Sequence, residues 1–221
     1  IPGLLDLVPP TDVKMRYETC AVVSGGGALA GSKMGPAIDA SGAVFRADNS
    51  PSAMKYSVDV GKRTNFQVLN REWGETLLKR SDATGSPHVA RWWLDVATVV
   101  LWHPASLRSY AALRTIYPDA SVLFLSPDLE SVARRAFERL RVSMEEVLQR
   151  ALFEKQETMS SLLYAIFLAM QTCNKVSVYG VIPSCGGSDQ SSNAKWRCKR
   201  SFSYFDDSEP THERTMRATS E

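Results

Sequence analysis

The stretch CAVVSGGGALAGSKMGPAIDASGAVFRADNSP, residues 20–51, decides the fold. An apolar run opens it, three glycines interrupt it, and a second apolar segment ends in Arg46 and Asp48. This order predicts a buried strand, a glycine turn and a second strand. Glycines after a first strand let the backbone approach a ligand, and their amides can face a phosphate. Because SGGGALAG is not in GxGxxG register, a tight turn between strand and helix is the alternative interpretation.

The rest of the chain alternates between strand and helix patterns. Apolar runs predict further strands at residues 65–70, 96–102, 121–126 and 175–181, and helical patterns cover residues 106–118, 127–141, 143–156 and 160–172. The third helix is expected to start at a capping box, Ser143 to Glu146, and the fourth to be buried nearly all round. This alternation predicts an α/β fold, with a Rossmann-like, mostly parallel sheet and helices on both faces.

Composition and length set limits on the class of protein. The chain has 221 residues, of which 44% are hydrophobic and 23% charged, so we expect one globular domain. We interpret residues 1–17, which are rich in proline, as an N-terminal arm, and residues 18–221 as the domain. A formal net charge of +2 gives no general argument for binding nucleic acid or a membrane surface. No apolar run approaches the length of a membrane-spanning helix.

Four cysteines, at positions 20, 173, 185 and 198, allow three disulfide pairings, and spacing alone does not choose between them. Two disulfides in an oxidising compartment are the favoured interpretation. The three histidines, His88, His103 and His212, are scattered, and no CxxC pair is present, so we expect no zinc site.

Three segments, taken in order, resemble the sialyl motifs of the eukaryotic-type sialyltransferases, glycosyltransferases that use CMP-sialic acid. The segment MSSLLYAIFLAMQTCNKVSVYGV, residues 159–181, resembles the small motif, and SYFDD, residues 203–207, resembles the third motif. DVGKRT, residues 59–64, also follows the family pattern. The matches to the large motif are Cys20, Ala21, Val22, Val23, Gly27, Leu29, Gly31, Ser32, Gly35, Pro36, Ile38, Asp39, Val44, Arg46 and Pro51.

The resemblance implies a variant of the GT-A glycosyltransferase fold that needs no metal and no cofactor besides the CMP-sialic acid donor. It also implies a Cys20–Cys173 disulfide between the large and small motifs, with two buried free thiols as the alternative; Cys185–Cys198 would be a local second bridge. A Golgi-luminal domain is implied, carried in the full-length protein by a type II membrane anchor outside this chain. If His212 is not the base, the chain is expected to stop before the family's last motif.

The expected reaction transfers sialic acid from CMP-sialic acid to a glycan acceptor with inversion, as in protein glycosylation. A base takes the proton of an acceptor hydroxyl while the CMP phosphate leaves. His212 is the candidate base; the alternative is an exposed loop residue, because Arg217 stands where the family pattern has Glu. The resemblance implies donor-binding roles for Gly25, Gly26, Gly27, Asp48, Ser160, Ser161, Ser203 and Tyr204.

Several positions depart from the family pattern. Asparagines of the large motif fall at Gly25, Ala28 and Asp48, and the histidine of the third motif falls at Ser203. A carboxylate at Asp48 would repel a phosphate unless it meets ribose hydroxyls instead. These changes support a second hypothesis, a catalytically degenerate relative that binds nucleotide or glycan. A Rossmann dehydrogenase fits the glycines alone and does not predict the small motif.

Other polar residues have two interpretations each. Arg46 either pairs with Asp39 or Asp59 or binds the donor phosphate, because a buried guanidinium needs a partner. Ser160 and Ser161 are candidate helix N-caps that could also present the helix N-terminus to an anionic donor. His103 is expected to be structural. Trp92, Trp93 and Trp102 are expected in the core, with a sugar-stacking platform as the alternative.

Overall fold

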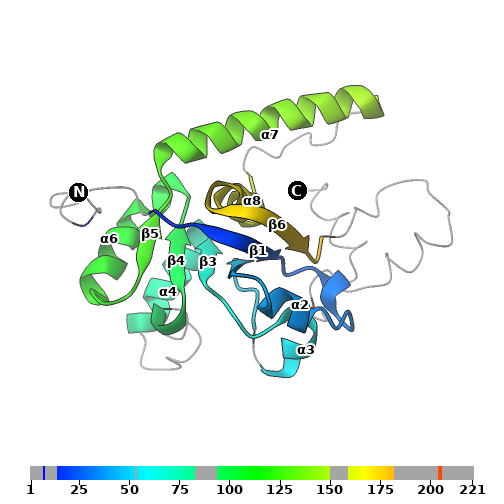
Figure 1. Cartoon of the computed structure of the whole chain (residues 1–221). Helices are drawn as coiled ribbons and strands as arrows, with labels where there is room; N and C mark the ends of the chain where they lie inside the picture. Colours follow the sequence, from blue (N-terminus) through cyan, green and yellow to red (C-terminus); the bar gives the residue numbers. More distant parts are fainter. Residues whose placement is uncertain are drawn as a thin grey trace.

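In the part of the chain that the structure describes, one sheet of six parallel strands forms the centre, in the order β5-β4-β3-β2-β1-β6 (Figure 1). The computed structural model describes residues 7, 14–52, 54–82, 94–149, 159–181 and 204–205. The strands are β1 (Tyr17–Val23), β2 (Ala43–Ala47), β3 (Phe66–Leu69), β4 (Thr98–Leu101), β5 (Val122–Phe124) and β6 (Cys173–Tyr179). Each falls within or overlaps a segment predicted as a strand, and the expected α/β, Rossmann-like sheet is confirmed.

Helices cover both faces of the sheet, as predicted. On one face lie α7 (Pro127–Leu148) and α8 (Ser161–Thr172). On the other lie α2 (Gly35–Asp39), α3 (Ser57–Val60), α4 (Arg71–Asp82) and α6 (Leu107–Ile116) (Figure 1). Within the described ranges, no helix combines the length and the hydropathy needed to cross a bilayer.

The alternation of side chains along the strands explains the two layers. In β1, Cys20 and Val22 pack in the cluster beneath α8, whereas Ala21 and Val23 pack with Ile38 of α2 on the opposite face. All five side chains are essentially inaccessible to solvent. Both faces of the strand are therefore apolar, which is the reason that a parallel strand is read as a continuous hydrophobic run.

A single helix replaces the two that the sequence predicted across residues 127–156. The α7 helix passes through Ser143, so Ser143 does not begin a new helix. Arg141 donates to Glu138 at 3.0 Å and to Glu145 at 3.2 Å, and these contacts join the residues on either side of the expected break. No proline or glycine lies near Ser143 to end the preceding helix. The capping-box pattern alone was therefore not enough to start a new helix.

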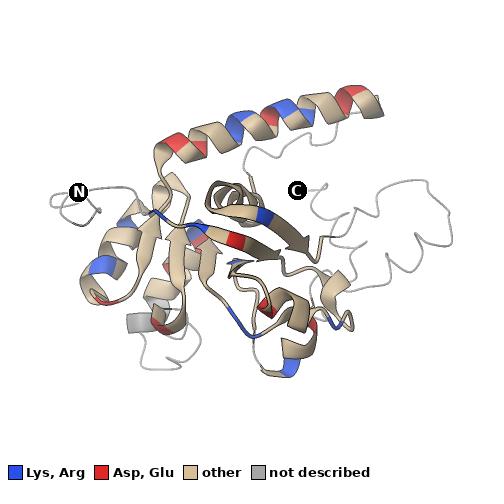
Figure 2. Cartoon of the chain, in the orientation of Figure 1, with Lys and Arg blue, Asp and Glu red and all other residues tan. Residues whose placement is uncertain are grey.

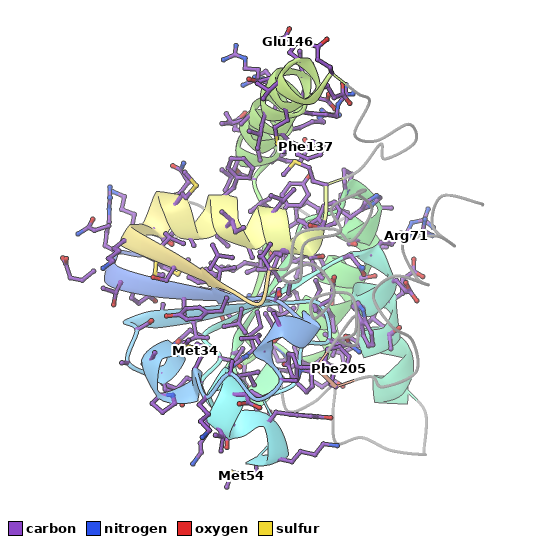
Figure 3. The ribbon with its side chains drawn as sticks, turned by 90° about the vertical axis from the view of Figure 1, so that its right-hand side faces the viewer. Met34, Met54, Arg71, Phe137, Glu146 and Phe205 are labelled. Atoms are coloured by element: carbon purple, nitrogen blue, oxygen red, sulfur yellow. A yellow bond between two sulfur atoms is a disulfide. The ribbon has the colours of Figure 1, made fainter. Side chains whose placement is uncertain are left out.

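Among the described residues, the α7 helix packs on the domain through its first half. Phe137 points from α7 toward α8, whereas Glu146 lies near the far end of the helix (Figure 3). Basic and acidic residues are interspersed along the helix (Figure 2). Ion pairs three or four residues apart stabilise such a helix modestly where packing is absent.

The α8 helix is less buried than expected. Tyr164, Ala165 and Ala169 are buried against the sheet, but Met170 keeps 59% of its surface exposed. Its start was predicted correctly, because the Oγ of Ser160 accepts a hydrogen bond from the Leu163 amide at 3.4 Å. The helix therefore has one buried face rather than a fully buried circumference.

The disulfide between Cys20 and Cys173 is present, which confirms that prediction. The bridge links β1 to the first residue of β6, directly after the last residue of α8. The two strands are neighbours in the sheet, where Cys20 faces Val176. Cys185 and Cys198 lie outside the described residues.

Arg46 is a buried structural residue. Its guanidinium donates to the carbonyl oxygens of Val60 at 2.7 Å and Arg63 at 3.0 Å, and to the Thr64 hydroxyl at 2.9 Å. Burial lowers the pKa of Arg46. The DVGKRT segment therefore serves to hold Arg46, because its backbone carbonyl oxygens accept hydrogen bonds from the guanidinium.

The predicted ion pair between Arg46 and Asp39 or Asp59 is wrong: among the described residues, Arg46 forms no ion pair with a carboxylate. Asp39 accepts hydrogen bonds from the backbone amides of Lys62 and Arg63, at 3.0 Å each. Asp59 likewise accepts from the amides of Gly31 and Lys33, at 2.8 Å each. Both carboxylates stabilise loops, because backbone amides without a secondary-structure partner need acceptors.

Candidate donor-binding site

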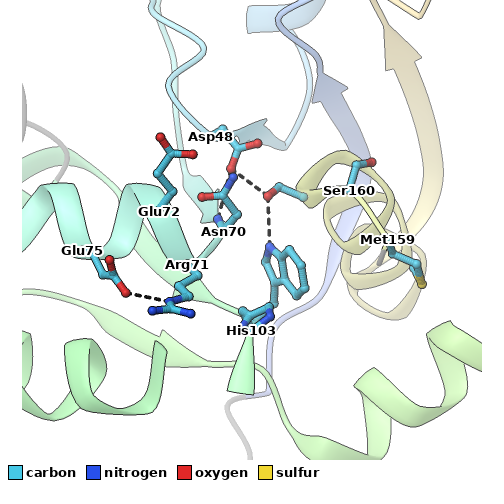
Figure 4. A pocket seen from close by; sticks show the side chains of 10 residues that line it. Asp48, Asn70, Arg71, Glu72, Glu75, His103, Met159 and Ser160 are labelled. Atoms are coloured by element: carbon cyan, nitrogen blue, oxygen red, sulfur yellow. Dashed lines mark hydrogen bonds and ion pairs between the residues drawn. The ribbon is translucent and has the colours of Figure 1, made fainter. Parts of the chain in front are cut away.

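A cavity of about 430 Å³ lies at the carboxyl ends of β2, β3 and β4. Each of these strands is followed by residues that line it, namely Asp48 after β2, Asn70 after β3, and Trp102 and His103 after β4. The start of α8 closes the cavity from the other side with Ser160 and Ser161 (Figure 4). Ligands of open parallel sheets bind in this position, outside the carboxyl ends of the strands.

Asp48 is held in an uncommon backbone conformation. Its φ is 48°, in the left-handed region that asparagine and aspartate tolerate better than most residues. The carboxylate oxygen Oδ1 accepts hydrogen bonds from the Ser161 hydroxyl at 2.7 Å and from the Asn70 amide at 3.1 Å. The second oxygen, Oδ2, has no hydrogen-bond partner among the described residues.

Burial raises the pKa of Asp48 above the ordinary carboxyl value. The hydrogen bonds from Ser161 and Asn70 oppose this shift, because they stabilise the ionised form, and the nearby Glu72 carboxylate adds to it. The environment therefore favours the protonated carboxyl more than water does.

Trp102 connects the sheet to the helix at the same place. Its Nε1 donates to the Ser161 hydroxyl at 3.0 Å, and that hydroxyl in turn donates to Asp48 (Figure 4). The indole stacks on Tyr164, with 4.2 Å between ring centroids. Trp102 is buried, as predicted, and it also contributes to the cavity wall.

The first turn of α4 forms the outer wall. Asn70 precedes this helix, and its Oδ1 accepts a hydrogen bond from the Trp73 amide at 2.9 Å. Arg71 and Glu75 form an ion pair of 2.7 Å, and Glu72 stands beside them (Figure 4). An asparagine cap thus begins a helix whose first residues face the cavity.

His103 has the structural role that was predicted for it. Its Nδ1 accepts a hydrogen bond from the Ala105 amide at 3.1 Å and caps the short helix η3 (Pro104–Ser106). Its ring also lines the cavity.

Six of the seven predicted donor-binding residues that the structure describes fall into two groups. Asp48, Ser160 and Ser161 line the cavity together. Gly25, Gly26 and Gly27 lie elsewhere, at the end of β1, and are not among the lining residues that the structure describes.

The glycine loop packs against the third motif. The amide of Tyr204 donates to the Gly25 carbonyl at 3.1 Å, and its hydroxyl donates to the Pro51 carbonyl. A β-carbon on Gly25 would lie 3.1 Å from the Phe205 ring, and one on Gly26 would lie 1.9 Å from the Gly180 oxygen. These glycines therefore permit close packing between segments far apart in sequence.

Several predicted residues lie outside the described ranges: His88, Trp92, Trp93, Cys185, Cys198, Ser203 and His212. Within the described ranges, no group of three potential metal-ligating side chains occurs.

Sequence reasoning missed the contribution of Asn70, Arg71, Glu72, Glu75 and Met159 to the cavity. A signal for Asn70 was available, because the residue directly after a parallel strand lies at the ligand-binding edge of the sheet. The α4 helix itself was not predicted, so its first turn could not be placed.

Comparisons with known proteins agree with this architecture. The chain matches the model of glycosyltransferase family 29 (sialyltransferase) over residues 4–219. Human alpha-N-acetylgalactosaminide alpha-2,6-sialyltransferase 3 is 25% identical over 190 residues, 81% of this chain and 58% of the human protein. Beta-galactoside alpha-2,6-sialyltransferase 2 of Bos taurus is 28% identical over 200 residues, 85% of this chain and 38% of the bovine protein.

A solved structure shares the fold. The crystal structure of a mammalian sialyltransferase in complex with Gal-beta-1-3GalNAc-ortho-nitrophenol matches with a TM-score of 0.55 and 19% identity. The match covers 99% of this chain and 72% of that chain. The chain spans 38% to 58% of the length of the human and bovine relatives. Since the family model matches almost the whole sequence, this chain belongs to glycosyltransferase family 29, the sialyltransferases.

Proposed function

We propose that the chain is the donor-binding part of a sialyltransferase that moves sialic acid from CMP-sialic acid to a glycan hydroxyl with inversion. The observation that carries this proposal is the family match over residues 4–219, combined with a cavity at the carboxyl ends of β2, β3 and β4. The cavity brings together Asp48 from the large motif and Ser160 and Ser161 from the small motif. Those motifs carry the donor site in the resemblance described above.

The chemistry assigned to the site is a displacement at the anomeric carbon. The acceptor oxygen forms the new bond, CMP leaves with the bonding electrons, and a base takes the acceptor proton. We assign His212 as that base and Ser203 and Tyr204 to the donor side. Gly25, Gly26 and Gly27 lie outside the cavity, and we assign their backbone to the donor side as well. No metal ion or further cofactor takes part in this proposal.

The proposed setting is the Golgi lumen, with a membrane anchor encoded outside this chain. The Cys20–Cys173 disulfide supports an oxidising compartment. The partners are a nucleotide-sugar donor and a glycan acceptor.

A first experiment tests donor binding by thermal unfolding with CMP and with CMP-sialic acid. A ligand present at about 100 times its Kd stabilises the folded chain by about 2.7 kcal/mol, so the midpoint should rise. UMP, which differs from CMP in its nucleobase, serves as the control for recognition of cytosine. An unchanged midpoint with millimolar CMP would contradict the donor site.

A second experiment tests the reaction by measuring CMP release. The names of the human and bovine relatives specify an acetylgalactosaminide and a galactoside, so both kinds of acceptor belong in the assay. Loss of turnover in His212→Ala, with turnover retained in His88→Ala, would support His212 as the base. Donor binding without CMP release on any acceptor would favour the degenerate relative.

A further inference from the structure

The cavity carries an acidic lining, which is unusual for a site that is proposed to take a phosphate. Its charged side chains are three carboxylates and one guanidinium, a formal charge of −2 with His103 neutral: Asp48, Glu72, Glu75 and Arg71. The guanidinium of Arg71 is already paired with Glu75 at 2.7 Å. The first residue of α8 and the two residues before it also line the cavity, and none of them carries a charge: Met159, Ser160 and Ser161.

Asp48 is a carboxylate of this lining that accepts hydrogen bonds from two other segments of the chain. Ser161 and Asn70 both donate to its Oδ1, which fixes the plane of the carboxyl group. Its Oδ2 has no hydrogen-bond partner among the described residues. An ionised Oδ2 can only accept hydrogen bonds and would repel a phosphate oxygen, whereas a protonated Oδ2 is a donor that a phosphate oxygen can accept.

The geometry points to a proton-coupled donor site: we propose that Asp48 takes up a proton from solvent on Oδ2 when a phosphodiester nucleotide binds in this cavity. This inference rests on the proposed function and adds a regulatory property to it. Nucleotide affinity therefore increases as the pH falls. The groups that face Asp48 in the cavity are Glu72, Arg71 and Glu75 from α4 and His103 after β4.

The surroundings support this assignment of the proton. Burial and the Glu72 carboxylate both raise the pKa of Asp48, so the proton binds there at a smaller cost than on an exposed aspartate. A bound phosphodiester adds a further negative charge and acts in the same direction. Glu72 itself is an exposed side chain in the first turn of α4.

Asp48→Asn is the matched variant for the test. Asparagine also tolerates the left-handed backbone at φ 48°, and its Oδ1 can accept the same two hydrogen bonds from Ser161 and Asn70. Its amide presents a donor permanently, without a proton from solvent. The change therefore removes the titration and leaves the shape of the site.

The experiment measures binding of cytidine 5′-methylphosphate, a phosphodiester, by calorimetry across roughly pH 5 to 8, in buffers of different ionisation enthalpy. We expect the wild type to take up about one proton per ligand at the upper end, with affinity falling up to about tenfold per pH unit. Asp48→Asn should take up no proton at position 48, and it should bind the ligand more tightly than wild type does at high pH. The ratio of the two Kd values should approach one at low pH, where Asp48 of the wild type already carries its proton before the ligand binds.

Two further measurements keep the outcomes distinct. For cytidine, which has no phosphate, the Kd values of wild type and Asp48→Asn should differ much less. If Asp48→Asn does not fold, Glu72→Gln replaces it, and the pH at which affinity changes should move downward because a charge that favours the proton is gone. A Kd ratio that stays constant with pH, or zero proton uptake by wild type, would overturn the Asp48 inference while donor binding stands. Absence of binding by every protein at every pH would overturn the proposed function as well.

Discussion

The indole Nε1 of Trp102 donates a hydrogen bond of 3.0 Å to the hydroxyl of Ser161, and so the end of β4 is joined to the first residue of α8. The Ser161 hydroxyl passes the connection on to Asp48 at 2.7 Å. Three segments, separated along the sequence by other elements, are therefore fixed at one side of the cavity by two hydrogen bonds.

Trp102→Phe removes the donor and keeps an aromatic ring to stack on Tyr164. We expect the free energy of unfolding to fall by about 2 kcal/mol, because a buried hydroxyl loses one partner and the smaller ring fills less space. Chemical denaturation measures this change. In a double-mutant cycle with Ser161→Ala, a coupling energy of about 1 kcal/mol is expected. Strict additivity of the two changes would show that this hydrogen bond does not stabilise the fold.

Removal of the Cys20–Cys173 bridge in the double alanine variant should lower stability strongly. The two residues are 153 positions apart, and a loop of that size corresponds to about 5 kcal/mol in the chain-entropy model. Thermal unfolding of the variant and of reduced wild type should show the same decrease in midpoint. Equal midpoints for oxidised and reduced wild type would contradict the prediction.

Alanine substitutions in the glycine loop should lower the free energy of unfolding by different amounts, and by more at Gly26 than at Gly25. Gly26→Ala places a β-carbon 1.9 Å from the Gly180 oxygen and is expected to cost 3 kcal/mol or more, roughly the upper end for overpacking. Gly25→Ala meets only the Phe205 ring at 3.1 Å and the Ser50 hydroxyl at 3.3 Å, and should cost about 1 kcal/mol.

Gly31→Ala is the control for backbone strain in that comparison. No atom of the described residues lies within 4 Å of a β-carbon added there, but φ is +73°, so about 1 kcal/mol is expected from conformation alone. The three variants are compared by their midpoints of denaturation. A smaller effect at Gly26 than at Gly31 would be inconsistent with the close approach to Gly180.

Asp48→Asn should change the dependence of stability on pH. Because the pKa of Asp48 is raised in the folded chain, the folded state holds this proton more tightly than the unfolded state. The stability that comes from the protonated carboxyl is complete below the unfolded aspartate pKa of about 3.9 and is lost as the pH rises through the higher folded value. The asparagine variant avoids that loss, so it should be more stable than wild type at neutral pH.

The measurement is the difference in free energy of unfolding between variant and wild type as a function of pH. The difference should grow from acid to neutral pH and then remain constant. Asp119→Asn, at an exposed position in the turn before β5, controls for the loss of one negative charge. A difference that shrinks toward neutral pH would contradict the raised pKa.

Much of the sheet could be predicted from the sequence, because a parallel strand buried on both faces is a short apolar run. The six strands of the described ranges were all found in this way, and Ser160 was identified as a cap from its position before an apolar helical pattern. The exposed parts were harder. The Ser143 pattern suggested a boundary inside α7, and α4 was missed, since polar surface helices are stabilised by contacts that no local pattern shows.

By itself, the sequence determined the layered α/β fold, the family motifs and their order, because these depend on hydrophobic pattern and residue identity. Only the tertiary structure decided what the polar residues do. It directed Arg46 to backbone oxygens rather than to Asp39, separated the three glycines from the cavity, and placed Asp48 beside Ser161, 113 residues away in the chain. The physical reason is that hydrogen bonds and burial act through space, so a polar side chain acquires its partner and its pKa only once distant segments have packed around it.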